Sequence, residues 1–181
     1  MANTPNRFSP KLEANLRHAG WFPGRRVDEA VIYDRCASVI KELGCRMFPT
    51  AFNILREFGG LHITVIPDNA AYNDSAPIEV WPLPCVSSPR VWFTLEWEFG
   101  EALFPVANYA EGEMSLFVAS SGRVYAYGYG YWYCGNTFEK ALENLKVAGG
   151  QIERMSILDF DEKRQESQRV YDALIQPSAQ H

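Results

Sequence analysis

The hydrophobic period of this chain changes at Gly59-Gly60, and that change limits the folds open to it. Before this point, apolar residues recur at helical spacing in three segments, 9–19, 28–43 and 49–58. Directly after it, apolar residues alternate with polar ones through residues 61–65, as in a strand with one covered face. Helices followed by strands predict an α+β domain: N-terminal helices packed on a central, mainly antiparallel sheet, with a C-terminal helix.

The connection between the first two predicted helices, residues 16–28, has an unusually specific order of turn residues. Asp28 is placed to cap the second helix, and Trp21 follows a glycine that ends the first. Two adjacent arginines, Arg25 and Arg26, lie inside the turn. Because guanidinium groups bond oxygen pairs well, we expect these arginines to bind backbone carbonyls or carboxylates there.

Residues 90–99 show the clearest alternation in the chain, which predicts a half-buried strand. The predicted inner face carries Val91, Phe93, Leu95, Trp97 and Phe99. The predicted outer face carries Arg90, Trp92, Thr94, Glu96 and Glu98. A hairpin is expected around Ser120-Ser121-Gly122, between strands at 114–119 and 123–127.

Tyrosine occupies every second position from Tyr125 to Tyr133. In one continuous strand the five phenols would line a single face, but Gly128 and Gly130 favour a bend and cross-strand packing. Asn136, with a glutamate three residues later, predicts the start of the last core helix. We expect one domain over residues 1–150 and a C-terminal extension over 151–181, helical at 161–175.

Composition excludes several classes of protein. No apolar run approaches the about 18 residues of a membrane span, and the N-terminus lacks a secretory pattern, so a cytoplasmic location is expected. The cysteines are scattered singly, which predicts free buried thiols and neither a metal site nor a disulfide framework. They are Cys36, Cys45, Cys85 and Cys134.

Charge is unevenly distributed along the chain. Residues 57–122 contain nine acidic side chains against a single arginine, a net charge of −8. Such a segment argues against nucleic-acid binding and suits a basic protein partner, although ordinary solubility also explains it.

Motifs for catalysis are sparse. None of the three histidines lies in a metalloprotease pattern, there is no serine nucleophile elbow, and no cofactor loop is found. Glu96 and Glu98 offer a carboxylate pair for glycoside chemistry, but a solvated strand face explains them more simply. We therefore expect a binding protein without catalytic residues or cofactor.

Five segments, in order along the chain, resemble bacterial immunity proteins of the SUKH superfamily, in particular its third immunity subfamily. These segments are 19–28, 55–61, 99–106, 121–125 and 135–145. The resemblance implies an α+β fold and a cytosolic antidote that binds and neutralises a toxin domain of a polymorphic toxin system, often a nuclease.

The leading hypothesis is thus a non-enzymatic immunity protein that occludes its toxin. A regulatory or scaffold module of the SUKH type is the main alternative, and a carbohydrate-binding or hydrolytic protein is the third. The predicted toxin contacts are Trp92, Glu96, Glu98, Glu101, Glu111 and Glu113.

Overall fold

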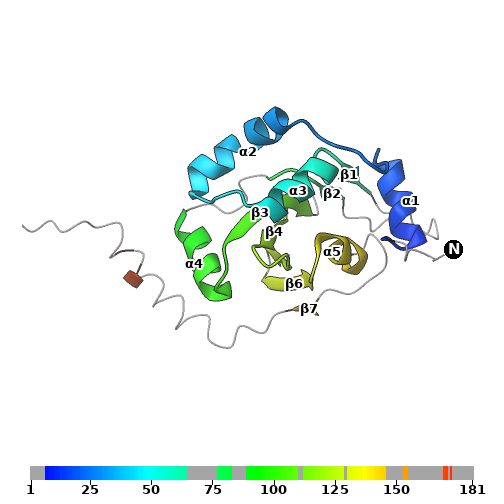
Figure 1. Cartoon of the computed structure of the whole chain (residues 1–181). Helices are drawn as coiled ribbons and strands as arrows, with labels where there is room; N and C mark the ends of the chain where they lie inside the picture. The colour runs from blue at the N-terminus through cyan, green and yellow to red at the C-terminus, as the bar shows by residue number, and fades with distance from the viewer. Residues whose placement is uncertain are drawn as a thin grey trace, which may run out of the picture.

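The computed structural model describes residues 7–64, 77–82, 89–109, 112–128, 130–145, 153–154, 169–170 and 172. Within these residues, helices lie on both sides of one antiparallel sheet (Figure 1). The α+β class predicted from the sequence is confirmed.

The first third of the chain forms helices α1 (Pro10–His18), α2 (Glu29–Leu43) and α3 (Pro49–Phe58). The side chain of Ser9 accepts a hydrogen bond from the Leu12 amide at 3.2 Å, and thereby caps α1. Asp28 caps α2 in the same way, through the Ala30 amide at 2.8 Å. The three predicted helices are confirmed, because their caps and apolar stripes are local features of the sequence.

The described residues form a seven-stranded sheet in which each strand pairs antiparallel with the next in the chain. Its strands are β1 (His62–Ile63), β2 (Ile78–Glu79), β3 (Leu103–Tyr109), β4 (Met114–Ala119), β5 (Val124–Tyr127), β6 (Tyr131–Gly135) and β7 (Glu153–Arg154). The predicted hairpin is present between β4 and β5, where Gly122 has a φ of 94°.

Residues 90–99 are not a strand, and that prediction was wrong. The segment lies in helix α4 (Pro89–Phe99). Its apolar content is dense enough to satisfy both periods, since Trp92, Leu95 and Phe99 also share one helical face. Trp92 and Leu95 are buried, so burial against the sheet favours the helical arrangement.

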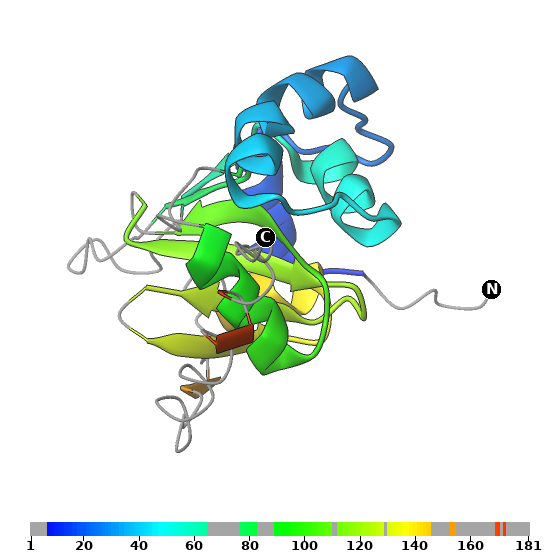
Figure 2. The same ribbon diagram turned by 90° about the vertical axis from the view of Figure 1, so that its left-hand side faces the viewer.

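Helix α4 covers one face of the sheet, in front of the strands in Figure 2. Trp92 meets Phe117 of β4 edge-on, with ring centroids 5.3 Å apart. Phe99 stacks on Tyr125 of β5 at 4.2 Å. Because Phe117 and Tyr125 are cross-strand partners, both contacts lie on the same face.

Helices α3 and α5 (Phe138–Asn144) pack against the other face, α1 lies against β1, and α2 contacts α3 and α4. Phe104 precedes Pro105, the β3 partner of Phe117, so its side chain lies on the face opposite α4. Its ring lies 6.5 Å from that of Phe48, just before α3. Phe58 of α3 contacts Phe138 of α5 at 5.3 Å. Helix α5 starts one residue later than predicted, because Thr137 rather than Asn136 is its N-cap.

The tyrosine-rich segment is a bent hairpin rather than one strand. Tyr125 lies opposite Tyr133 and Tyr127 opposite Tyr131 across β5 and β6, so cross-strand packing is confirmed. Gly128 allows the bend, because a Cβ there would approach the Glu113 carbonyl oxygen to 2.5 Å.

The segment beyond residue 150 begins by extending the sheet, since β7 pairs with β6. Most of the predicted helix at 161–175 lies outside the described residues. The division into a domain over 1–150 and an extension over 151–181 stays a prediction.

Candidate functional site

The acidic residues predicted to contact a partner do not come together on one surface. Glu101 lies just before β3, and Glu113 lies in the turn after it. These two positions are at opposite ends of a seven-residue strand, a separation of about 23 Å for extended chain. Glu111 lies outside the described residues. The predicted acidic sheet surface is therefore divided between two ends of a hairpin.

Glu96 has a position inside the fold. Its carboxylate accepts a hydrogen bond from the Leu103 amide at 2.9 Å, which joins α4 to the start of β3. Burial raises the pKa of Glu96 above its ordinary value, and the Leu103 hydrogen bond opposes that effect. This carboxylate therefore stabilises the α4–β3 connection.

Glu101 also bonds within the chain. It forms an ion pair with Arg123 at 2.8 Å and accepts a hydrogen bond from the Ser121 amide at 3.0 Å. Only 13 % of its side chain is exposed. Glu101 thus fixes the β4–β5 turn against the start of β3.

The other members of the predicted set differ in exposure. Trp92 is 2 % exposed, so its prediction as a surface contact was wrong: α4 directs its indole onto Phe117. Glu98 is half-buried, and Glu113 is exposed.

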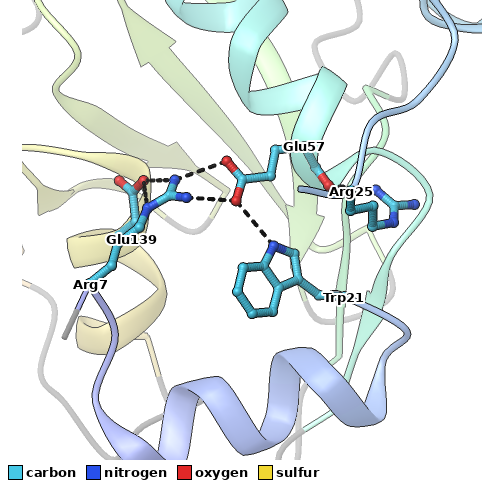
Figure 3. A network of polar contacts seen from close by, with 5 residues as sticks. All are labelled: Arg7, Trp21, Arg25, Glu57 and Glu139. Atoms are coloured by element: carbon cyan, nitrogen blue, oxygen red, sulfur yellow. Dashed lines mark hydrogen bonds and ion pairs between the residues drawn. The ribbon is translucent and has the colours of Figure 1, made fainter. Parts of the chain in front are cut away.

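The structure instead brings together a polar network that spacing did not predict (Figure 3). Arg7 bonds both carboxylate oxygens of Glu57 on α3, at 2.6 and 3.0 Å. The same guanidinium binds Glu139 on α5, through Nε at 3.1 Å and also through Nη2. One arginine therefore links two helices that are far apart in the sequence.

The turn at residues 16–28 joins this network through Trp21 and Arg25 (Figure 3). The Trp21 indole donates a hydrogen bond to Glu57 at 3.1 Å. Arg25 donates to the carbonyl oxygens of Glu57 at 2.5 Å and Gly59 at 2.7 Å. These bonds satisfy carbonyls at the end of α3, so the expectation for Arg25 is confirmed.

Glu139 and Arg25 differ in how their charges are compensated within the network. Burial alone would raise the pKa of Glu139, but hydrogen bonds and charge from Arg7 outweigh it and lower that pKa. Burial lowers the pKa of Arg25, against the attraction of Glu57. The guanidinium of Arg25 thus lacks a carboxylate hydrogen-bond partner of its own among the described residues.

Two open pockets, each of about 310 Å³, flank this network. The first lies between α3, the β4–β5 turn and the start of α5, and includes Thr50, Ile54, Ser121, Asn136, Thr137 and Phe138. The second lies between α3 and the turn, and includes Gly24, Arg25, Arg26 and Arg56. Both pockets share Arg7, Asn53 and Glu57. We call the two pockets together the α3 groove.

Comparison with protein families identifies the family of this chain. The model of the SUKH-3 immunity protein family matches residues 8–148. The chain belongs to the SUKH-3 immunity protein family. No curated protein and no solved structure gave a match.

The SUKH-3 match includes α1 to α5 and β1 to β6, and therefore both faces of the sheet. It also contains Trp21, Arg25, Glu57 and Glu139 of the network, whereas Arg7 immediately precedes it. The α3 groove is thus formed almost entirely from the family domain.

The sequence patterns did not predict the network of Arg7, Glu57 and Glu139, nor Asn53 and Arg56 as groove residues. Glu57 and Glu139 lie in segments that resemble the family, which was the only available signal. Their pairing depends on how the helices cross the sheet, and a linear pattern does not contain that information.

The cysteines are buried free thiols at the three described positions, as predicted. Burial raises the pKa of Cys36, Cys45 and Cys134 to about 12, so they remain protonated at neutral pH. Cys85 lies outside the described residues.

The described residues contain neither a metal-binding cluster nor a membrane-spanning helix. No group of histidine, cysteine and carboxylate side chains there is arranged to hold a metal ion. No helix in that part of the chain is long and apolar enough to cross a bilayer.

Proposed function

We propose that this SUKH-3 protein binds and neutralises a cognate toxin domain of nuclease type in the bacterial cytoplasm. The family match over residues 8–148 carries the proposal, because it covers α1 to α5 and strands β1 to β6. The chain would act by occupying the toxin's surface, without chemistry of its own.

Charge supports a nuclease as the target. Residues 57–122 have a net charge of −8, from nine acidic side chains and one arginine. A nuclease binds a polyanionic substrate through basic side chains, and an acidic inhibitor complements that surface. Complementary charge also accelerates encounter, which matters when a toxin must be stopped quickly.

Among the predicted acidic contacts, we favour the residues of the turn between β3 and β4. Glu96 and Glu101 already bond backbone amides of this chain, so a partner would compete with the fold for them. Glu113 is exposed in that turn, and Glu111 lies two residues before it in the sequence. We therefore propose Glu113 as the main acidic contact, with Glu98 and Glu111 as secondary contacts.

Co-expression tests the function. Cells that express the toxin encoded beside this chain should survive only when the chain is also produced. Death of cells that contain the folded chain would contradict the immunity proposal and favour a regulatory or scaffold role. Purified toxin should also lose nuclease activity on addition of the chain, which separates inhibition from indirect protection.

A charge-reversed variant locates the contact in the same system. Glu113→Lys should slow association with the toxin several-fold at low salt, and less at high salt, because exposed charges are screened. Glu42→Lys on α2 is the matched control, since it makes the same charge change at another exposed position. Equal rates for both variants would remove the β3–β4 turn from the interface without affecting the immunity proposal.

A further inference from the structure

The pocket between α3 and the turn is strongly basic within an acidic protein. Among the described residues it is lined by Arg7, Arg25, Arg26 and Arg56, with Glu57 as the one carboxylate. The whole chain has a net charge of −5, so this concentration of arginine is local. A pocket of this composition favours an anionic ligand.

The four arginines differ in what they already bind. Arg7 is held by two carboxylates, and Arg25 by two backbone carbonyls. Arg26 is exposed and Arg56 half-buried, and among the described residues neither forms an ion pair. The guanidinium groups of Arg26 and Arg56 are thus available in this pocket, whereas those of Arg7 and Arg25 are held in place by the bonds they already form.

The turn that carries Arg26 also presents an exposed aromatic ring. Phe22 is 56 % exposed, although it lies beside the buried Trp21. The Arg25 amide donates to the Phe22 carbonyl at 3.1 Å, and Gly24 has a φ of 81°, so the turn is closed and defined. A rigid aromatic residue beside arginines is typical of protein-binding hot spots.

The first pocket of the α3 groove, between α3, the β4–β5 turn and α5, has a different character. Ile54, Phe58 and Phe138 provide apolar surface, and Thr50, Ser121 and Asn136 provide polar groups around it. Arg7, Asn53 and Glu57 line both pockets, and we call the boundary that they mark the ridge. A ligand that crosses this ridge meets arginines on one side and a mixed apolar and polar surface on the other.

We propose that the α3 groove binds an extended, carboxylate-bearing segment of a partner protein. Aspartate or glutamate side chains of the segment pair with Arg26 and Arg56 in the basic pocket. The segment then crosses the ridge, where the Asn53 amide offers both a donor and an acceptor to its backbone. An apolar side chain further along enters the first pocket, beside Ile54 and Phe138.

The groove suits a peptide better than a nucleic acid. Nucleic-acid affinity comes mainly from many phosphate contacts along an extended basic surface. Here the basic surface is one pocket, and only two of its four arginines form neither an ion pair nor a carbonyl hydrogen bond among the described residues. The inference does not depend on the toxin being a nuclease.

Binding of short labelled peptides to the full chain tests the proposal. Fluorescein-labelled hexaglutamate should bind at low salt, and hexaglutamine should not. Binding should shift the backbone amide resonances of Arg25, Arg26, Asn53 and Arg56 in NMR spectra. Replacing both available arginines, Arg26→Ala with Arg56→Ala, should weaken hexaglutamate binding by about tenfold or more.

A double variant with the same loss of charge provides the control. Lys41→Ala with Arg46→Ala removes two exposed basic side chains outside both pockets, and should leave the affinity within about twofold. Thermal unfolding followed by circular dichroism verifies that both double variants fold. Equal losses in the two variants, or no hexaglutamate binding, would overturn the proposal. Tighter binding of hexathymidylate than of hexaglutamate would also overturn it, and would identify a nucleic-acid surface.

Discussion

The two faces of the sheet are attached to their helices by different chemistry. On one face, α4 makes aromatic contacts through Trp92 and Phe99, and its carboxylate Glu96 bonds a single backbone amide. On the other face, α3 and α5 share Arg7 between the carboxylates of Glu57 and Glu139. Apolar burial thus dominates one attachment, and a charged network is added to apolar burial in the other.

This difference indicates where the molecule tolerates change. Apolar burial is non-directional and adds up over area, whereas a charged network depends on each partner being present. The polar side also holds the turn that carries Arg25, and therefore the shape of the α3 groove. Variants on the two faces should accordingly differ in size of effect and in pH dependence.

The largest effect is expected on the apolar face. Trp92→Ala removes a fully buried ring that contacts Phe117, and should lower the free energy of unfolding by about 3–5 kcal/mol. Urea unfolding of the wild type and the variant measures it. Trp97 on the same helix is 44 % exposed, so Trp97→Ala should cost less than about 1 kcal/mol. Similar losses for the two tryptophans would contradict the attachment of α4 by its buried face.

The structure also separates features that a linear pattern predicts from those it does not. Asp28 was predicted correctly as a cap, because a capping side chain bonds an amide two or three residues away. Residues 90–99 were assigned to a strand because their alternation is real, but which period prevails depends on the surface available for burial. The sheet face that α4 covers consists of residues distant in the sequence.

The candidate site shows the same limit. Arg25 was expected to bond carbonyls or carboxylates, and it bonds two carbonyls at the end of α3. The acidic residues were grouped because they are close in sequence, yet the β3–β4 hairpin separates Glu101 from Glu113. The net charge of residues 57–122 can be counted from the sequence. Which of its carboxylates share a surface depends on how the strands and helices are arranged.

A smaller effect is expected from the centre of the polar network. Glu57→Ala removes the acceptor of Trp21 and one of the two carboxylates on Arg7, and should cost about 2 kcal/mol in urea unfolding. Glu57→Gln keeps an acceptor for Trp21 and should cost less. If the glutamine variant loses as much as the alanine variant, the ion pair with Arg7 rather than the indole hydrogen bond dominates. No loss in either variant would show that the network does not contribute to the free energy of unfolding, and would contradict the contrast between the two faces.

The smallest effect distinguishes the two faces by its sign. The pKa of Glu139 is lowered from an ordinary value of 4.5, so its contribution to stability is present above that pH and is lost as the pH falls through the folded pKa. The pKa of Glu96 is raised from the same value, so its contribution is greatest below pH 4.5 and is lost as the pH rises. The two carboxylates therefore respond to pH in opposite directions.

Glutamine variants measure these opposite slopes, because glutamine does not titrate. From acidic to neutral pH, the unfolding free energy of the wild type should rise relative to Glu139→Gln and fall relative to Glu96→Gln. Each comparison cancels the titration of all other carboxylates, so the sign is interpretable even where the difference is small. Parallel slopes would mean that Glu96 is not buried where α4 meets β3, or that Arg7 does not bind Glu139. The Trp92 and Glu57 variants would distinguish between these two explanations.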